Sequence, residues 1–222
     1  MRLRLWHARW AVSWHAIVAC LAGAALGAAL ISWQQRMASV VLPLIALLTA
    51  AGTAFVLDDT AGDVTRVTAR GSRWATVNRL AAAGGVALVG VGFIALALGD
   101  MGGLHGWTVV ITALALAAVA IAAWRVRRHQ CTPGSTVASA LVLLGLVPFV
   151  ASRLFSGAWP YPSPVLEHPA RDRWLVVATV ATVALAWAVL RPLPGPSRGL
   201  RTRVRTDARA GAHPDARTGI RA

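Results

Sequence analysis

Long apolar stretches recur along this chain and clusters of arginine separate them, which constrains the fold more than any other feature. A helix rises about 1.5 Å per residue, so about 20 apolar residues cross the roughly 30 Å hydrocarbon core of a bilayer. Six stretches come near this length, at residues 11–32, 39–57, 80–99, 107–124, 136–155 and 174–190. The sequence therefore predicts an all-α, polytopic membrane protein with six transmembrane helices.

The arginines predict the orientation, because basic residues near span ends are retained on the cytoplasmic side. The chain has no lysine, so arginine alone carries this signal. Most arginines lie before span one, between spans two and three, between spans four and five, and after span six, which is one side of the membrane in a six-span topology. The other side receives only Arg36, Arg153, Arg171 and Arg173. We therefore expect both termini to be cytoplasmic.

The sequence divides into three predicted regions: a cytoplasmic leader, a transmembrane domain and a cytoplasmic tail. Residues 1–10 mix Arg with Leu and Trp, which suits an amphipathic cytoplasmic leader, although an unstructured basic leader fits equally well. Residues 11–190 form the transmembrane domain. Residues 191–222 are rich in Arg, Gly and Pro and poor in large apolar residues, so we expect a disordered basic tail.

The net charge of +14 has two possible partners. In a soluble protein such a charge would favour nucleic acid, because clustered Arg releases counterions from phosphates. Here the arginines lie beside membrane spans, where each gains about 1 kcal/mol from anionic lipid. We expect anionic lipids as partners and no nucleic acid.

The connection between spans two and three, residues 57–80, is the longest between spans on the cytoplasmic side. Its arginines recur at helical spacing, which predicts a short helix that presents charge to a cytoplasmic partner. A solvated loop whose arginines only enforce topology is the alternative. The candidate partner-binding residues are Asp58, Asp59, Asp63, Arg66, Arg70 and Arg73.

Two further groups of residues are candidates for contacts. Gly23 and Gly27 have GxxxG spacing in span one, and Gly84 and Gly85 lie in span three, where small residues let helices approach closely. Outside, the loop between spans five and six contains a rigid, interface-seeking run. Its candidate residues are Trp159, Pro160, Tyr161 and Pro162.

Catalytic motifs are missing from the sequence. The chain has no GxxxxGK[ST] phosphate loop, no HExxH helix and no CxxC pair. His15 is the one histidine inside a predicted span, and it lies near the span's end, which favours packing over a proton relay. We therefore predict a protein that is not an enzyme and has no catalytic, metal or cofactor site.

The layout resembles the permease subunits of ABC-2-type transporters, in particular the small actinobacterial six-span kind with a DDPA-like sequence after the second span. Here that segment reads DDTAGDVTR, residues 58–66, with Thr60 in place of Pro. The leader, the long cytoplasmic connection and the elongated external loop match the family's elbow helix, coupling helix and external gate. The resemblance implies ATPase contact at residues 60–74 and a gate at residues 156–172.

The resemblance also implies a function. The chain would be a non-catalytic membrane permease subunit of an ABC-type exporter in the bacterial plasma membrane, working as a homo- or hetero-dimer with a separate ATPase. The alternative is a scaffold or accessory subunit that transports nothing and uses its basic tail to bind lipid or a cytoplasmic partner.

Overall fold

A computed structural model describes residues 12–58, 72–99, 103–128, 133–154 and 168–190, without the side chains of 72–76, 127, 144–154 and 168–171. These described residues form helices and contain no strand. The elements, in chain order, are α2 (Trp14–Trp33), the short η1 (Gln35–Met37), α3 (Ala38–Phe55), α5 (Ser72–Leu98), α6 (Leu104–Arg127), α7 (Pro133–Leu154) and α8 (His168–Leu190).

Five of these helices, α2, α3, α5, α6 and α8, are long and apolar enough to cross a membrane. The sixth, α7, has 22 residues. Its apolar part among the described side chains, Pro133–Leu143, is shorter than a span. The prediction of an all-helical chain with several membrane-length apolar helices is therefore confirmed for the described residues, while the sixth span stays a prediction.

Two helices begin more than one turn earlier than the apolar pattern predicts. Helix α5 begins at Ser72 rather than at residue 80, and α8 begins at His168 rather than at residue 174. Hydropathy identifies only the apolar part of a helix and does not detect polar residues that form its first turns. Residues 72–79 contain neither Gly nor Pro, so nothing in this stretch interrupts the helix.

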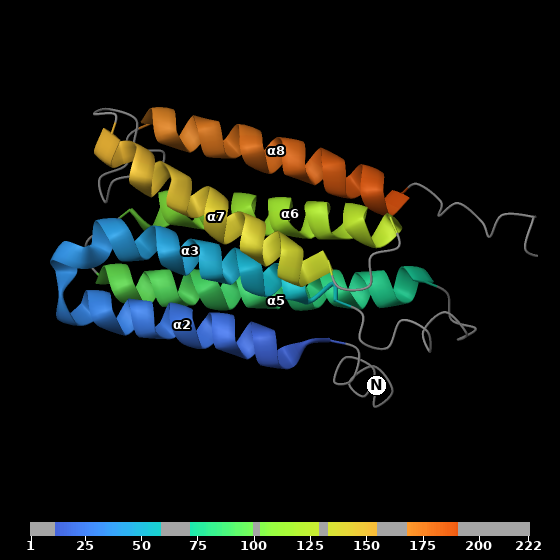
Figure 1. Ribbon diagram of the computed structural model, residues 1–222, viewed down its shortest axis with the longest axis horizontal. Helices are drawn as coiled ribbons and strands as arrows, with labels where there is room; N and C mark the ends of the chain where they lie inside the picture. Colours follow the sequence, from blue (N-terminus) through green and yellow to red (C-terminus); the bar gives the residue numbers. More distant parts are fainter. Residues whose placement is uncertain (1–11, 59–71, 100–102, 129–132, 155–167, 191–222) are drawn as a thin grey trace, which may run out of the picture. The chain divides into compact units, whose positions relative to one another are not determined.

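Helix α3 lies at the centre of the helix packing (Figure 1). It contacts α2, α5, α6 and α7, whereas α8 packs against α6. As a result, 72% of the apolar stretch of α3 is buried, against 11% for α8. Apolar side chains that are exposed in this way suit a lipid environment.

Hydroxyl groups on the helices find partners within their own helix. Thr49 and Thr53 are buried in α3 and donate to Ile45 O at 2.8 Å and Ala50 O at 2.7 Å. Exposed Thr112 and Thr179 do the same, to Thr108 O at 2.7 Å and Leu175 O at 2.8 Å. Because hydrocarbon offers no hydrogen-bond partner, this pattern fits helices that face lipid.

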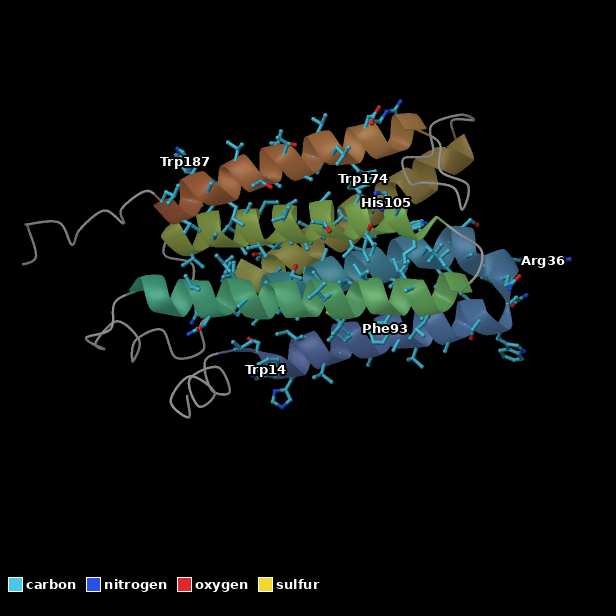
Figure 2. The ribbon with its side chains drawn as sticks, turned by 180° about the vertical axis from the view of Figure 1, so that it is seen from behind. Trp14, Arg36, Phe93, His105, Trp174 and Trp187 are labelled. Carbon is cyan, nitrogen blue, oxygen red and sulfur yellow. The ribbon has the colours of Figure 1, made fainter. Side chains whose placement is uncertain are left out.

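Tryptophans lie towards the two ends of the described helices. Figure 2 labels Trp14 and Trp187 towards one end and Trp174 towards the other. Trp33, which ends α2, is 89% exposed. Trp side chains at both ends are typical of the two membrane interfaces.

Helices α3 and α5 approach closely at Gly90. A Cβ added there would lie 2.8 Å from Thr49 Cβ, and Thr49 is fully buried. Neither group has a flexible end that can move aside. Gly90 is therefore required by the contact between these two helices.

Replacing Gly90 with Ala should lower the free energy of unfolding by about 1–3 kcal/mol, because the added methyl overpacks the interface with α3. The measurement is thermal unfolding in mild detergent. Gly92→Ala is the matched control, since nothing lies within 4 Å of a Cβ at Gly92 on the same helix. Equal melting temperatures for the two variants would contradict the close contact.

Candidate functional site

The contacts that the described residues make through charged side chains lie at one end of the helices, where α3 and α6 end and α5 and α7 begin (Figure 1). We call this the Asp58 end. Helix α3 finishes at Phe55, and a turn follows in which Asp58 N donates to Phe55 O at 3.1 Å. The turn directs the Asp58 side chain into the protein, where it is only 4% exposed. A buried carboxylate needs partners to offset the loss of hydration.

The first partner of Asp58 is the beginning of α7. Gly134 N donates to Asp58 Oδ1 at 2.6 Å, which joins residues 76 apart in sequence. The first amides of a helix have no acceptor within that helix, and its N-terminus favours negative charge. Asp58 therefore caps α7 from a different helix.

The geometry of this contact requires glycine at 134. A Cβ added there would lie 2.7 Å from Asp58 Oδ2 and 2.9 Å from Asp58 Cγ. Any larger residue would push the carboxylate away from the amide. Pro133 precedes it as the first residue of α7, a position that proline favours because the missing N–H would have no helical acceptor.

The second partner is Arg79 of α5, whose positive charge attracts the carboxylate. Burial nevertheless raises the pKa of Asp58 above its ordinary value, and the Gly134 hydrogen bond and the charge of Arg79 offset this only in part. Asp58 thus links the ends of α3, α5 and α7. The ionised form costs free energy at this position.

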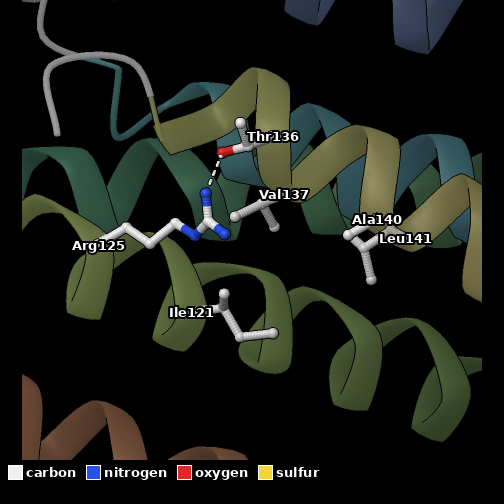
Figure 3. Close-up of a pocket in the computed structure, with 6 residues that line it drawn as sticks. All are labelled: Ile121, Arg125, Thr136, Val137, Ala140 and Leu141. Carbon is white, nitrogen blue, oxygen red and sulfur yellow. Dashed lines mark hydrogen bonds between the residues drawn. The ribbon is translucent and has the colours of Figure 1, made fainter.

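Helices α6 and α7 have their own link at the same end. Arg125 Nη1 donates to Thr136 Oγ1 at 2.8 Å, beside a cavity of about 50 Å³ lined by Ile121, Val137, Ala140 and Leu141 (Figure 3). One water molecule occupies about 30 Å³ of liquid. The cavity is therefore too small for a lipid or a peptide.

One more arginine near the Asp58 end meets an aromatic ring. The guanidinium of Arg128 lies 4.0 Å from the centroid of Trp124, a cation–π contact at the exposed end of α6. An arginine on an exposed tryptophan suits the headgroup region of a membrane.

Asp58, which we expected to contact a partner, is buried and bonded inside the chain. Its role in partner binding stays a prediction. Arg73 lies in the first turn of α5, where only the backbone is described. The remaining predicted contact residues lie outside the described residues: Asp59, Asp63, Arg66, Arg70, Trp159, Pro160, Tyr161 and Pro162.

The glycines predicted for helix packing divide into two groups. Cβ atoms at Gly23 and Gly27 of α2 would lie 3.1 Å from Leu48 Cδ1 and 3.0 Å from Ile45 Cγ1 of α3. Cβ atoms added at Gly84 and Gly85 of α5 would meet no atom within 4 Å beyond their own helix backbone. Any helix contact at Gly84 and Gly85 would thus have to come from outside the described residues.

Sequence reasoning missed the pairing of Asp58 with Gly134. The Pro-Gly pair at 133–134 marks a helix start, but nothing local indicates which acceptor it meets. His15, the other ionisable candidate, is exposed in the first turn of α2. Among the described residues no group of three His, Cys, Asp or Glu side chains could hold a metal ion.

Comparison with protein families, with curated proteins and with solved structures finds no match for this chain. Its function must therefore be argued from its own residues.

Replacing Asp58 with Ala should lower the free energy of unfolding by about 1–3 kcal/mol, because the Gly134 amide loses its acceptor in a buried position. Asp58→Asn should be much milder, since the amide oxygen still accepts this bond. Thermal unfolding in detergent compares the two variants. Equal losses in both would mean that the charge, rather than the hydrogen bond, carries the contact.

The raised pKa of Asp58 predicts a pH dependence. The folded protein holds the proton more tightly than the unfolded chain, so this contribution to stability is complete below the ordinary carboxyl pKa of about 4. It is lost as pH rises through the folded pKa. The melting temperature of Asp58→Asn relative to the wild type should therefore increase from pH 4 to pH 8. A constant difference would contradict the raised pKa.

Proposed function

We propose that this chain is the non-catalytic membrane permease subunit of an ABC-type exporter, driven by a separate ATPase. In this proposal the chain crosses the bacterial plasma membrane six times, and the Asp58 end and both termini face the cytoplasm. The distribution of arginine supports this orientation, because the connections after α3 and α6 and the chain after α8 all leave from this end.

One observation carries the proposal: the most buried helix, α3, leads through Asp58 directly into the connection 59–71, which carries Arg66 and Arg70. A protein that docks on this connection acts on the helix that contacts α2, α5, α6 and α7. Force applied at a connection that continues from α3 reaches more of the molecule than force applied at a peripheral helix such as α8.

The pathway is proposed to lie between two permease chains, identical or different. Within the described residues, the cavity of about 50 Å³ between α6 and α7 is too small for a lipid or a peptide. ATP hydrolysis on the partner would shift the connection 59–71 and rearrange the helices around that pathway. In this mechanism the chain transmits motion and performs no covalent chemistry.

The proposal is tested by purifying the tagged protein from its native membranes in mild detergent and identifying its companions by mass spectrometry. We expect a stoichiometric ATPase with a phosphate-binding loop. The double variant Arg66→Glu with Arg70→Glu should lose this ATPase while still inserting, because the docking charges are reversed. Arg128→Glu is the matched control at the same end, since its arginine stacks on Trp124 outside the connection.

The outcomes separate the candidate functions. Retention of the ATPase by the double variant would overturn the docking segment. Recovery of the chain alone, or with a different enzyme, would overturn the permease and favour a lipid-binding or partner-binding scaffold. In that case deletion of residues 197–222 should abolish partner binding.

A further inference from the structure

Asp58 occupies a special position with respect to the proposed docking segment. It directly precedes the connection 59–71 in the chain, and its side chain is bonded to α7. Because Asp58 is covalently joined to this connection, any displacement of the connection reaches Asp58 before the rest of α3. The next atom along this route is the Gly134 amide, in the first turn of α7.

We propose that Asp58 is a positioning residue that transmits displacement of the connection 59–71 to the first turn of α7 through its bond to the Gly134 amide. The inference rests on the proposed function and deepens it, because it names the contact that links ATPase docking to one particular helix.

The short length of the link is the first argument. At 2.6 Å the hydrogen bond from Gly134 N to Asp58 Oδ1 is short and buried. Its loss would leave the Gly134 amide, a buried donor, without an acceptor. Glycine at 134 brings the backbone itself against the carboxylate, so no flexible side chain stands between the two helices.

The packing of α3 is the second argument. Its middle is closely held, with Gly90 of α5 set against the buried Thr49. Close-packed interiors resist deformation and transmit strain. A pull on Asp58 therefore moves the end of α3 and the helix attached to it, more easily than it moves α3 as a whole.

A second link to α7 provides an internal comparison. Arg125 of α6 bonds Thr136 two residues beyond Gly134, but this contact is exposed. It holds the same turn of α7, but Arg125 belongs to α6, which is not joined in sequence to the connection 59–71. Removal of the Thr136 hydroxyl should thus disturb the same turn without interrupting the proposed route.

The experiment is hydrogen–deuterium exchange of Pro133–Leu143, measured by mass spectrometry on the full chain alone and in complex with the copurified ATPase. The variants are Asp58→Ala, Asp58→Asn and Gly134→Ala, with Thr136→Val as the matched control. Gly134→Ala breaks the contact from its other side. It keeps the test decisive if Asp58→Ala fails to fold.

In the chain alone, exchange of these amides should rise about tenfold in Asp58→Ala and Gly134→Ala, as expected when a buried donor loses its hydrogen bond. Asp58→Asn should stay near the wild type. In the complex, ATP should change exchange of this segment in the wild type, Asp58→Asn and Thr136→Val. The change should disappear in Asp58→Ala and Gly134→Ala, although both still bind the ATPase.

Two failures are distinguishable. If the ATPase binds and Asp58→Ala responds to ATP as the wild type does, the positioning role is overturned and the proposed function stands. If no ATPase is recovered with the wild type, the proposed function fails, and the transmission role fails with it. A purely structural cap would raise exchange in the chain alone and leave the response to ATP intact, which also overturns the proposal.

Discussion

The packing of α3 against four other helices is the interaction on which the rest of the structure depends. Its small and β-branched side chains let α2 and α5 approach closely, at Gly27 on one side and Gly90 on the other. In a membrane, packing of this kind replaces the hydrophobic drive that lipid cannot supply. Around this core α6 and α7 take their places, and α8 is held through α6.

Polar chemistry is kept away from this packing. The buried hydroxyls of α3 are bonded within their own helix, and the described carboxylate that bridges helices, Asp58, lies beyond the last turn of α3. Arg79, Arg125 and Arg128 belong to the same end. The molecule therefore separates an apolar region that packs from an end where charges connect one helix to another, and the proposed partner would act on that end.

The apolar runs allowed the helices to be predicted because a membrane-spanning segment must be long and apolar, whatever its neighbours. The same argument explains the missed helix starts, since hydropathy does not register the polar turns before α5 and α8. The candidate site was harder to predict. Asp58 looks like a surface carboxylate in sequence, and its burial depends on Gly134, far along the chain. Glycine spacing was equally ambiguous: Cβ atoms added at Gly23 and Gly27 would meet α3, whereas Cβ atoms added at Gly84 and Gly85 would meet no other described helix.

The distance in sequence between Asp58 and Gly134 has a consequence for biosynthesis. When α3 leaves the ribosome, the amide that Asp58 will bind lies 76 residues away and has yet to be made. Until then water must solvate the carboxylate, which is possible because Asp58 follows the apolar part of α3. Helices such as α3, whose hydroxyls are already bonded internally, can enter the bilayer one at a time. The contacts that join α3, α5 and α7 can form only after α5, α6 and the beginning of α7 have been synthesised. The Asp58 end is therefore assembled late during synthesis.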